Sequence, residues 1–203
     1  MPDGTIYVGS GWLASFKGIV EDKDWINHVI MTSGHCVFAG KSWAKTITVI
    51  PGRYGDNKPY GEFVATKKAL RASKEWEEDS LYKSNYDYGA ILIPKIYKPN
   101  WGAMPFINLP DSDLEKSEVI NTGYPADKDI GTMWTANGPI TEVEKYKIKY
   151  MNDTYGGQSG SPAYLDDQVS KVVGIHGYGG CPNKAVRLTE NVINDMKKWA
   201  TED

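Results

Sequence analysis

Cysteine is scarce in this chain of 203 residues, which contains Cys36 and Cys181 and no others. Two cysteines are too few for a disulfide scaffold, and without the spacing of metal ligands they do not indicate a zinc site. The longest apolar runs, such as Ala90–Ile93, are far too short to cross a bilayer. The net charge of -3 gives no general attraction for nucleic acid or for anionic membranes. These exclusions leave a globular protein with one sizeable core as the expected class.

Glycine and tyrosine are plentiful instead, with 21 and 13 residues, which favours many strands and turns. Short apolar or β-branched runs recur along the chain, broken by Gly, Pro, Asn and Asp. These runs are Ile6–Ala14, His28–Thr32, Thr46–Ile50, Tyr88–Ile93, Val119–Thr122, Thr132–Thr135, Tyr146–Met151 and Val172–His176. Their spacing predicts an all-β sandwich or barrel. No internal repeat or low-complexity tract interrupts them, so we expect a single domain.

The C-terminal segment has a different pattern. Val192, Ile193, Met196 and Trp199 recur at helical spacing, and Thr189 is a suitable N-cap. We predict an amphipathic helix that packs its apolar side on the strands. The charged stretch 74–83 is interpreted as a short surface helix or a loop.

Ser159 lies in the glycine-rich run GGQSGSP, residues 156–162. Glycines on both sides permit a tight turn that presents a serine hydroxyl together with backbone N–H groups. A Gly-Ser surface loop without any function would have the same composition. The run alone therefore does not decide between a nucleophile and a loop.

His35 follows a strand-like run, within TSGHCV at residues 32–37. An imidazole has an ordinary pKa of about 6.5, which suits it to take up and return a proton near neutral pH. A histidine that is hydrogen-bonded in the core is the alternative. We assign that structural role to His28, which adjoins Val29 and Ile30 outside any motif.

Asp87 stands at the start of the apolar run Tyr88–Ile93. A carboxylate in such a place costs free energy unless it is paired. A buried carboxylate that orients an imidazole is the third member of a catalytic triad. The alternative is an aspartate that caps the strand in a turn.

The three candidates gain force in combination. They occur in the order His35, Asp87 and Ser159, with separations of 52 and 72 residues. That order is the one found in chymotrypsin-like serine proteases, and it differs from the order in subtilisins and α/β-hydrolases. We predict that the first two residues belong to one barrel and Ser159 to a second, with the catalytic site between them.

Longer stretches of the chain resemble the glutamyl endopeptidases of Gram-positive bacteria, a family of trypsin-like serine proteases. The similar stretches are VIPGR (49–53), PYG (59–61), NYDYGAI (85–91), GYP (123–125), GTMW (131–134), GPI (138–140) and DTYGGQSGSP (153–162). The resemblance implies two six-stranded-type antiparallel β-barrels and a C-terminal α-helix in a single peptidase domain spanning 1–203. The first barrel is expected at about 1–103, the second at about 104–188 and the helix at about 189–201.

The resemblance also implies cleavage after glutamate, and less readily after aspartate. In that family a histidine on the strand after the nucleophile helps to bind the substrate carboxylate, and the matching residue here is His176. A hydroxyl residue five positions before the serine lines the specificity pocket, and here it is Thr154. An imidazole N–H and a hydroxyl can both replace the hydration that a carboxylate loses on binding.

Two sets of backbone groups complete the expected site. Gly177, Tyr178 and Gly179 would form an edge that pairs with the backbone of the substrate. The N–H groups of Gly157 and Ser159 would form the oxyanion hole, which stabilises the negative charge on the substrate oxygen during the reaction.

The cysteines depart from the family pattern. Relatives with a Gly-His-Cys motif often bridge that cysteine to one near the start, but residues 8–12 read VGSGW here. Some relatives bridge the nucleophile loop to the segment after Gly-Tyr-Pro, where this chain has Gly157 and Ala126. We therefore expect Cys36 and Cys181 to be free thiols, and we expect no metal and no cofactor.

The N-terminus departs from the family as well. Members of the family have a longer N-terminal segment that includes a barrel strand, and in some of them the mature α-amino group helps to bind the glutamate. This sequence begins too late to supply that group, so an open barrel edge is expected. No signal peptide is visible before Thr5. The resemblance nevertheless implies a secreted monomer that acts on proteins or peptides and binds neither nucleic acid nor membranes.

Three functions are consistent with these residues. The first is a glutamate-directed endopeptidase that acts through an acyl-enzyme intermediate. The second is a serine endopeptidase of other, narrower specificity. The third is a catalytically silent protein that uses the protease fold to bind a partner.

Overall fold

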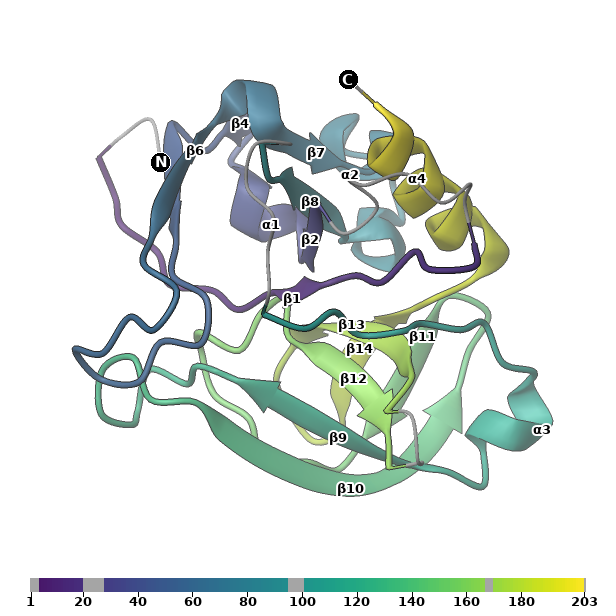
Figure 1. Ribbon diagram of the computed structural model, residues 1–203. Helices are drawn as coiled ribbons and strands as arrows, with labels where there is room; N and C mark the ends of the chain where they lie inside the picture. The colour runs from purple at the N-terminus through teal and green to yellow at the C-terminus, as the bar shows by residue number, and fades with distance from the viewer. Residues whose placement is uncertain (1–3, 20–27, 95–100, 167–169, 203) are drawn as a thin grey trace.

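The computed structural model describes residues 4–19, 28–94, 101–166 and 170–202. Antiparallel strands dominate this part of the chain and are gathered in two halves, one above the other in Figure 1. The described strands of the first half lie between residues 12 and 92, and those of the second half between 118 and 187. The predicted all-β class is confirmed. No helix among the described residues is long and apolar enough to span a membrane.

The first half is built around a four-stranded antiparallel sheet in the order β1-β2-β8-β7, with β3-β4 and β5-β6 as two further pairs. Its described strands are β1 (Trp12–Leu13), β2 (Val29–Thr32), β3 (Phe38–Ala39), β4 (Ser42–Trp43), β5 (Thr46–Val49), β6 (Phe63–Thr66), β7 (Leu70–Ala72) and β8 (Gly89–Leu92). The central strands β2 and β8 are covered on both faces, which explains their continuous apolar runs. Their register pairs Thr32 with Gly89, so the end of β2 adjoins the start of β8.

The second half is a closed antiparallel barrel in the order β10-β11-β14-β13-β12-β9. Its strands are β9 (Glu118–Gly123), β10 (Trp134–Val143), β11 (Lys147–Tyr150), β12 (Pro162–Leu165), β13 (Val172–Tyr178) and β14 (Asn183–Arg187). Side chains alternate between the interior and the exterior, as the pleat of a strand requires. In β11, Ile148 and Tyr150 are fully buried, whereas Lys147 and Lys149 are partly exposed.

Helices are few and mostly short. The α-helices that the structure describes are α1 (Gly34–Val37), α2 (Lys74–Glu77), α3 (Asp111–Leu114) and α4 (Glu190–Thr201), and two short 3₁₀ helices span Lys67–Ala69 and Lys83–Tyr86. The predicted C-terminal helix is confirmed as α4, and Thr189 is its N-cap residue, although the side chain makes no capping hydrogen bond. The charged stretch 74–83 contains α2, which begins after Ser73, and the Ser73 hydroxyl accepts a hydrogen bond from the Trp76 N–H.

The two halves share an apolar core that includes residues of β1, β2, β8, β13 and β14. Helix α4 follows the second half in sequence but packs on the first, beside β2 and β8. Its Met196 and Trp199 are buried in the shared core, and Tyr88 donates a hydrogen bond of 2.6 Å to Asp195. The halves are thus held together by a helix that reaches across their interface.

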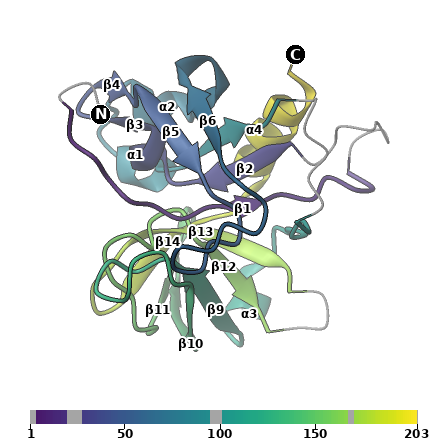
Figure 2. The ribbon, with the colours of Figure 1, turned by 60° about the vertical axis from the view of Figure 1, so that its left-hand side comes forward.

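The N-terminal segment differs from the prediction. The sequence predicts a strand over the run Ile6–Ala14, but only Trp12 and Leu13 pair with a neighbour as a strand. Ile6, Tyr7 and Val8 are exposed and lie outside any strand. The purple segment that leads to β1 instead descends along the outer side of the first half and then enters the interface between the halves, as Figures 1 and 2 show. Strand propensity alone does not form a strand where no neighbour is available to pair.

Candidate active site

His35 is placed by the end of a strand. The chain leaves β2 at Thr32, and His35 lies in the first turn of the short helix α1. A glycine is required just before it, since a Cβ at Gly34 would lie 2.9 Å from the Trp76 ring and 3.0 Å from Asp87 Oδ1. The absence of a side chain at position 34 therefore lets His35 and Asp87 approach each other closely.

Asp87 precedes β8 and is fully buried, with 0% of its surface exposed. Its Oδ1 accepts a hydrogen bond of 2.8 Å from the His35 backbone N–H, and its Oδ2 lies 2.7 Å from His35 Nδ1. Two donors offset the cost of burying this carboxylate. Because a carboxylate can only accept, Nδ1 carries a proton, and the neutral imidazole has its lone pair on Nε2.

The charge of Asp87 also affects the basicity of His35. Burial lowers the pKa of the imidazole, whereas the hydrogen bond and the charge of Asp87 raise it, and the net pKa lies above the ordinary 6.5. A pKa raised in this way stabilises the imidazolium that forms when a hydroxyl transfers its proton to the ring.

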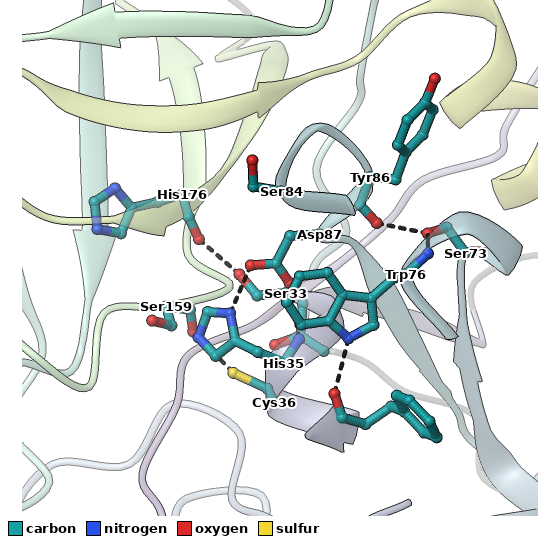
Figure 3. A network of polar contacts seen from close by, with 12 residues as sticks. Ser33, His35, Cys36, Ser73, Trp76, Ser84, Tyr86, Asp87, Ser159 and His176 are labelled. Atoms are coloured by element: carbon teal, nitrogen blue, oxygen red, sulfur yellow. Dashed lines mark hydrogen bonds and ion pairs between the residues drawn. The ribbon is translucent and has the colours of Figure 1, made fainter. Parts of the chain in front are cut away.

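Ser159 comes from the second half and faces this pair. Figure 3 shows it beside the His35 ring, on the side away from Asp87. The Ser159 carbonyl accepts a backbone hydrogen bond of 2.8 Å from Ser10, and the neighbouring Gly160 N–H donates to the His176 carbonyl at 2.7 Å. The structure thus brings together the three residues that sequence reasoning proposed as a triad.

The turn that presents Ser159 depends on Gly160. This residue has a φ of +91°, in the region that favours glycine. A Cβ here would lie 2.1 Å from Thr32 Oγ1 and 2.3 Å from the Ser10 carbonyl. The turn therefore packs directly against the backbone of the first half, which fixes the position of the serine relative to His35.

The backbone N–H groups of Gly157 and of Ser159 itself point away from the neighbouring backbone carbonyls. The Gly156 carbonyl accepts a hydrogen bond from Ala126, and the Gln158 carbonyl accepts one from Ser161. In a trans peptide the C=O and the N–H point in opposite directions, so the N–H groups of Gly157 and Ser159 face the other way. Within the described part of the chain, neither of these N–H groups has a hydrogen-bond acceptor.

His176 lies on β13 and is 2% exposed. Its Nδ1 is 2.6 Å from the hydroxyl of Tyr150, which is itself fully buried on β11. Burial, together with the nearby charge of His35, lowers the pKa of His176 to about 4, so the ring is neutral at pH 7. If the Tyr150 O–H donates to Nδ1, the ring proton is on Nε2 and that nitrogen becomes a donor.

Thr154 has a polar partner that the sequence did not reveal. Its hydroxyl donates a hydrogen bond of 2.6 Å to Asn183 Oδ1, which also accepts one from the Gly180 N–H. The Thr154 proton is therefore directed at Asn183 in this structure. By contrast, Nε2 of His176 forms no hydrogen bond to any described residue. Of the two side chains expected to bind the substrate carboxylate, His176 is therefore the one with a ring nitrogen that is free in the described structure.

The segment 177–179 comprises the end of the barrel strand β13, of which Tyr178 is the last residue, together with Gly179. Pairing of β13 with β12 ends at Ile175, so the residues after His176 have an unpaired edge on that side within the described structure. A Cβ at Gly177 would lie 3.6 Å from Asp87 Oδ2, and the ring of Tyr178 lies 6.2 Å from the ring of His35. An extended peptide could add to this edge with its backbone next to His35.

Neither cysteine forms a disulfide, as predicted. Cys181 is exposed, whereas Cys36 is half-buried and its Sγ lies 3.6 Å from the Ser159 carbonyl. A Cβ built on Gly9 would lie 2.9 Å from that same Sγ. The position where relatives are expected to have a bridging cysteine is thus occupied by a glycine.

Tyr150 and Asn183 are the residues that sequence reasoning missed. Both lie far from the motifs along the chain and reach the site through the register of the barrel, in which Tyr150 pairs with Asn183 between β11 and β14. The available signal was the alternation of the run Tyr146–Met151, which predicts that every second side chain points inward.

Comparison with known proteins adds independent findings. Residues 23–200 match the family model described as Trypsin. A Bacillus subtilis protein named extracellular metalloprotease is 37% identical over 179 residues, covering 86% of this chain and 56% of that protein. The glutamyl endopeptidase of Bacillus licheniformis is 36% identical over 182 residues, covering 84% and 56%. The chain spans about half the length of these curated relatives.

A solved structure of a Glu endopeptidase in complex with MPD superimposes with a TM-score of 0.76 at 23% identity, covering 86% of this chain and 82% of that one. The fold expected from the resemblance is therefore confirmed. The name of the Bacillus subtilis relative refers to a metal. Among the residues that the structure describes, no three His, Cys, Asp or Glu side chains are grouped so as to hold one.

Proposed function

Because the chain belongs to the trypsin family, we propose that it is a serine endopeptidase that cleaves peptide bonds after glutamate, and less readily after aspartate. The observation that carries the proposal is the position of His35, with Nδ1 at 2.7 Å from Asp87 on one side and Ser159 on the other. This is the arrangement of a nucleophile, a base and the carboxylate that orients the base.

In the proposed reaction, Ser159 Oγ attacks the carbonyl carbon of the scissile bond and its proton passes to His35 Nε2. Asp87 holds the imidazole in place and stabilises its protonated form. The N–H groups of Gly157 and Ser159 stabilise the negative charge that develops on the carbonyl oxygen. His35 then gives its proton to the leaving amine, and an acyl-enzyme remains on Ser159.

Water completes the cycle. It attacks the acyl carbon while its proton passes to His35, and the same proton returns to Ser159 Oγ as the acid product leaves. This route needs no group beyond the side chains and backbone groups already described, so we propose no cofactor.

Glutamate preference is assigned to His176. With Tyr150 donating to Nδ1, the neutral ring offers an Nε2 proton to the substrate carboxylate. A hydrogen bond to a charged acceptor is stronger than a neutral one and offsets part of the lost hydration. Thr154 would contribute a donor only after its hydroxyl rotates away from Asn183. Gly177, Tyr178 and Gly179 would bind the substrate backbone as an added strand.

The names of the relatives support a proposal for the biological setting. One of them is named extracellular and another glutamyl endopeptidase. We propose that this protein is also secreted, acts as a monomer, and cleaves proteins or peptides that contain glutamate.

The test is a cleavage map. The purified protein is incubated with a diverse peptide mixture, and every cut is identified by mass spectrometry, with the Ser159→Ala variant as the blank. Cuts clustered after glutamate are expected. Cuts after other residues would retain the triad but refute the role of His176. If no cuts exceed the blank and a fluorophosphonate probe fails to label Ser159, the protein is a silent member of the family.

A further inference from the structure

A lysine lies close to the proposed catalytic residues without taking part in the chemistry. Lys147 is the first residue of β11 and is partly exposed, because its side chain points out of the barrel. Its Nζ donates a hydrogen bond of 2.9 Å to the Ser84 hydroxyl and lies 5.6 Å from the centre of the Tyr178 ring. Three separate segments therefore meet at this ammonium group.

The two residues that contact Lys147 also lie close to the proposed catalytic residues. The Tyr178 ring that it covers lies 6.2 Å from the His35 ring. Ser84 belongs to the 3₁₀ turn Lys83–Tyr86, which leads directly into Asp87, and Figure 3 shows it next to that residue. The ammonium is thus separated from the catalytic imidazole by one aromatic side chain.

The two lysines at this place have no direct carboxylate partner in the described structure. Within the described chain, neither Lys147 nor Lys184 forms an ion pair; the contacts of Lys147 are with the Ser84 hydroxyl and the Tyr178 ring. Burial and the charge of Lys184 both lower the pKa of Lys147, whereas Glu144 and Asp87 raise it. By contrast Lys149, the next outward residue of β11, pairs with Glu142 at 2.8 Å and Glu144 at 2.6 Å.

We propose that Lys147, supported by Lys184, forms a second acid-binding subsite that receives an aspartate or glutamate side chain of the substrate, upstream of the scissile bond. This inference rests on the proposed endopeptidase function. Lys147 lies over the Tyr178 ring, and Lys184 is the cross-strand partner of Tyr178 between β13 and β14. Two lysines that form no ion pair in the described chain match a carboxylate through charge and hydrogen bonding. The preferred substrate is then an acidic segment of a protein rather than an isolated glutamate.

The strand geometry indicates which substrate residues reach this subsite. A peptide that adds to the edge at residues 177–179 is extended, so its side chains alternate between two faces. If the glutamate before the scissile bond (P1) points toward His176, then P3 shares its face. The second and fourth residues before the bond (P2 and P4) point to the opposite face, where Tyr178 and Lys147 lie.

The test uses a series of peptides with glutamate at P1 and either glutamate or glutamine at P2, P3 or P4. Cleavage at the P1 bond is followed by mass spectrometry, so that cuts after any additional glutamate are counted apart. For the unmodified protein we expect kcat/KM to be about threefold to tenfold higher with glutamate than with glutamine at P2 or P4. No such difference is expected at P3, and 1 M salt should weaken the preference.

Three variants test whether Lys147 causes the preference for glutamate at P2 or P4. Lys147→Met should abolish the preference, whereas Lys147→Arg should retain it because the charge is retained. Lys149→Met is the matched control on the same strand, and it should leave the preference unchanged because that lysine is already paired with Glu142 and Glu144. Thermal unfolding of each variant shows that the comparison is made between folded proteins.

The possible failures are distinct. If peptides are cleaved after the P1 glutamate with equal kcat/KM for glutamate and glutamine at P2 and P4, the second subsite is refuted while the proposed function stands. The same holds if Lys147→Met retains the preference. If no peptide is cleaved after glutamate at all, the proposed function is refuted and this inference with it.

Discussion

Replacing Gly9 with cysteine should create a disulfide that stabilises the protein. A Cβ at position 9 would lie 2.9 Å from Cys36 Sγ, close to the separation of about 3 Å between these atoms in a disulfide. Gly9 is not among the glycines with positive φ, so its backbone accepts an L-residue without strain. The bridge would join residues 27 positions apart and link the N-terminal segment to the helix that bears His35.

The size of the effect follows from the loop that the bridge closes. A closed loop of this length removes chain entropy from the unfolded state, which stabilises the folded state by about 3.5 kcal/mol at 25 °C. For a protein of this size the corresponding rise in the unfolding temperature is about 7 to 14 °C. Reduction of the bridge should cancel the gain, because the entropy of the open chain is then restored.

Thiol titration and thermal unfolding check this prediction together. The unmodified protein should titrate with two thiols and oxidised Gly9→Cys with one, that of Cys181. The control is Gly9→Ser, which adds a side chain of similar size without a bridge. Three titratable thiols in oxidised Gly9→Cys, or an unfolding temperature equal to that of Gly9→Ser, would refute the geometry deduced for residues 9 and 36.

Three further predictions concern the histidines. Asp87→Asn should lower kcat by about 10⁴-fold, because the amide no longer holds the required tautomer of His35, and steady-state kinetics measures this loss. Tyr150→Phe should reduce kcat/KM for glutamate peptides about tenfold relative to glutamine peptides, since Nδ1 of His176 loses its donor; an unchanged ratio would contradict the assigned tautomer. Below pH 6.5 the histidine binds a proton in the unfolded state, whereas burial prevents His176 from binding one in the folded state until about pH 4. The neutral, buried His176 therefore contributes about 3 kcal/mol to the free energy of unfolding above pH 6.5, and this contribution is lost as the pH falls to 4. Urea unfolding at pH 7 and pH 4 should therefore show a smaller loss for His176→Asn than for the unmodified protein.

Sequence reasoning could propose the three candidate catalytic residues because their neighbours along the chain determine their local geometry. Ser159 requires a glycine turn, His35 requires a small residue before it, and Asp87 requires a strand immediately after it. Each requirement appears as a short motif, so the order and spacing of residues along the chain are enough to single out all three. The same applies to α4, whose apolar positions recur at helical spacing.

Features that depend on pairing between distant segments could not be predicted in the same way. Tyr150 reaches His176 only through the register of β11, β14 and β13, and Lys147 reaches Tyr178 by the same route. Strand β14 was missed because it begins with the polar residues Asn183 and Lys184, and its inward alternation is short. β3 and β4 have two residues each and leave no periodic signal.

The early part of the chain shows the opposite error. Thr5 to Val8 has the composition of a strand, yet none of these residues lies in a described strand and their side chains are exposed. Composition reports what a segment could form, whereas pairing depends on a neighbour with a free edge. In this segment the sequence indicates a tendency to form a strand but does not determine whether a strand forms.

The position of α4 has a consequence for how such a protein is made. Tyr88, next to Asp87, donates its hydrogen bond to Asp195, and Arg71 pairs with Glu202 at 2.6 Å. During translation, strands β2 and β8 can pair early, but these two partners leave the ribosome more than a hundred residues later. The first half therefore cannot complete these contacts, or face Ser159, until the rest of the chain has been synthesised. A catalytic site assembled in this order, as proposed here, would be complete only after α4 has been synthesised.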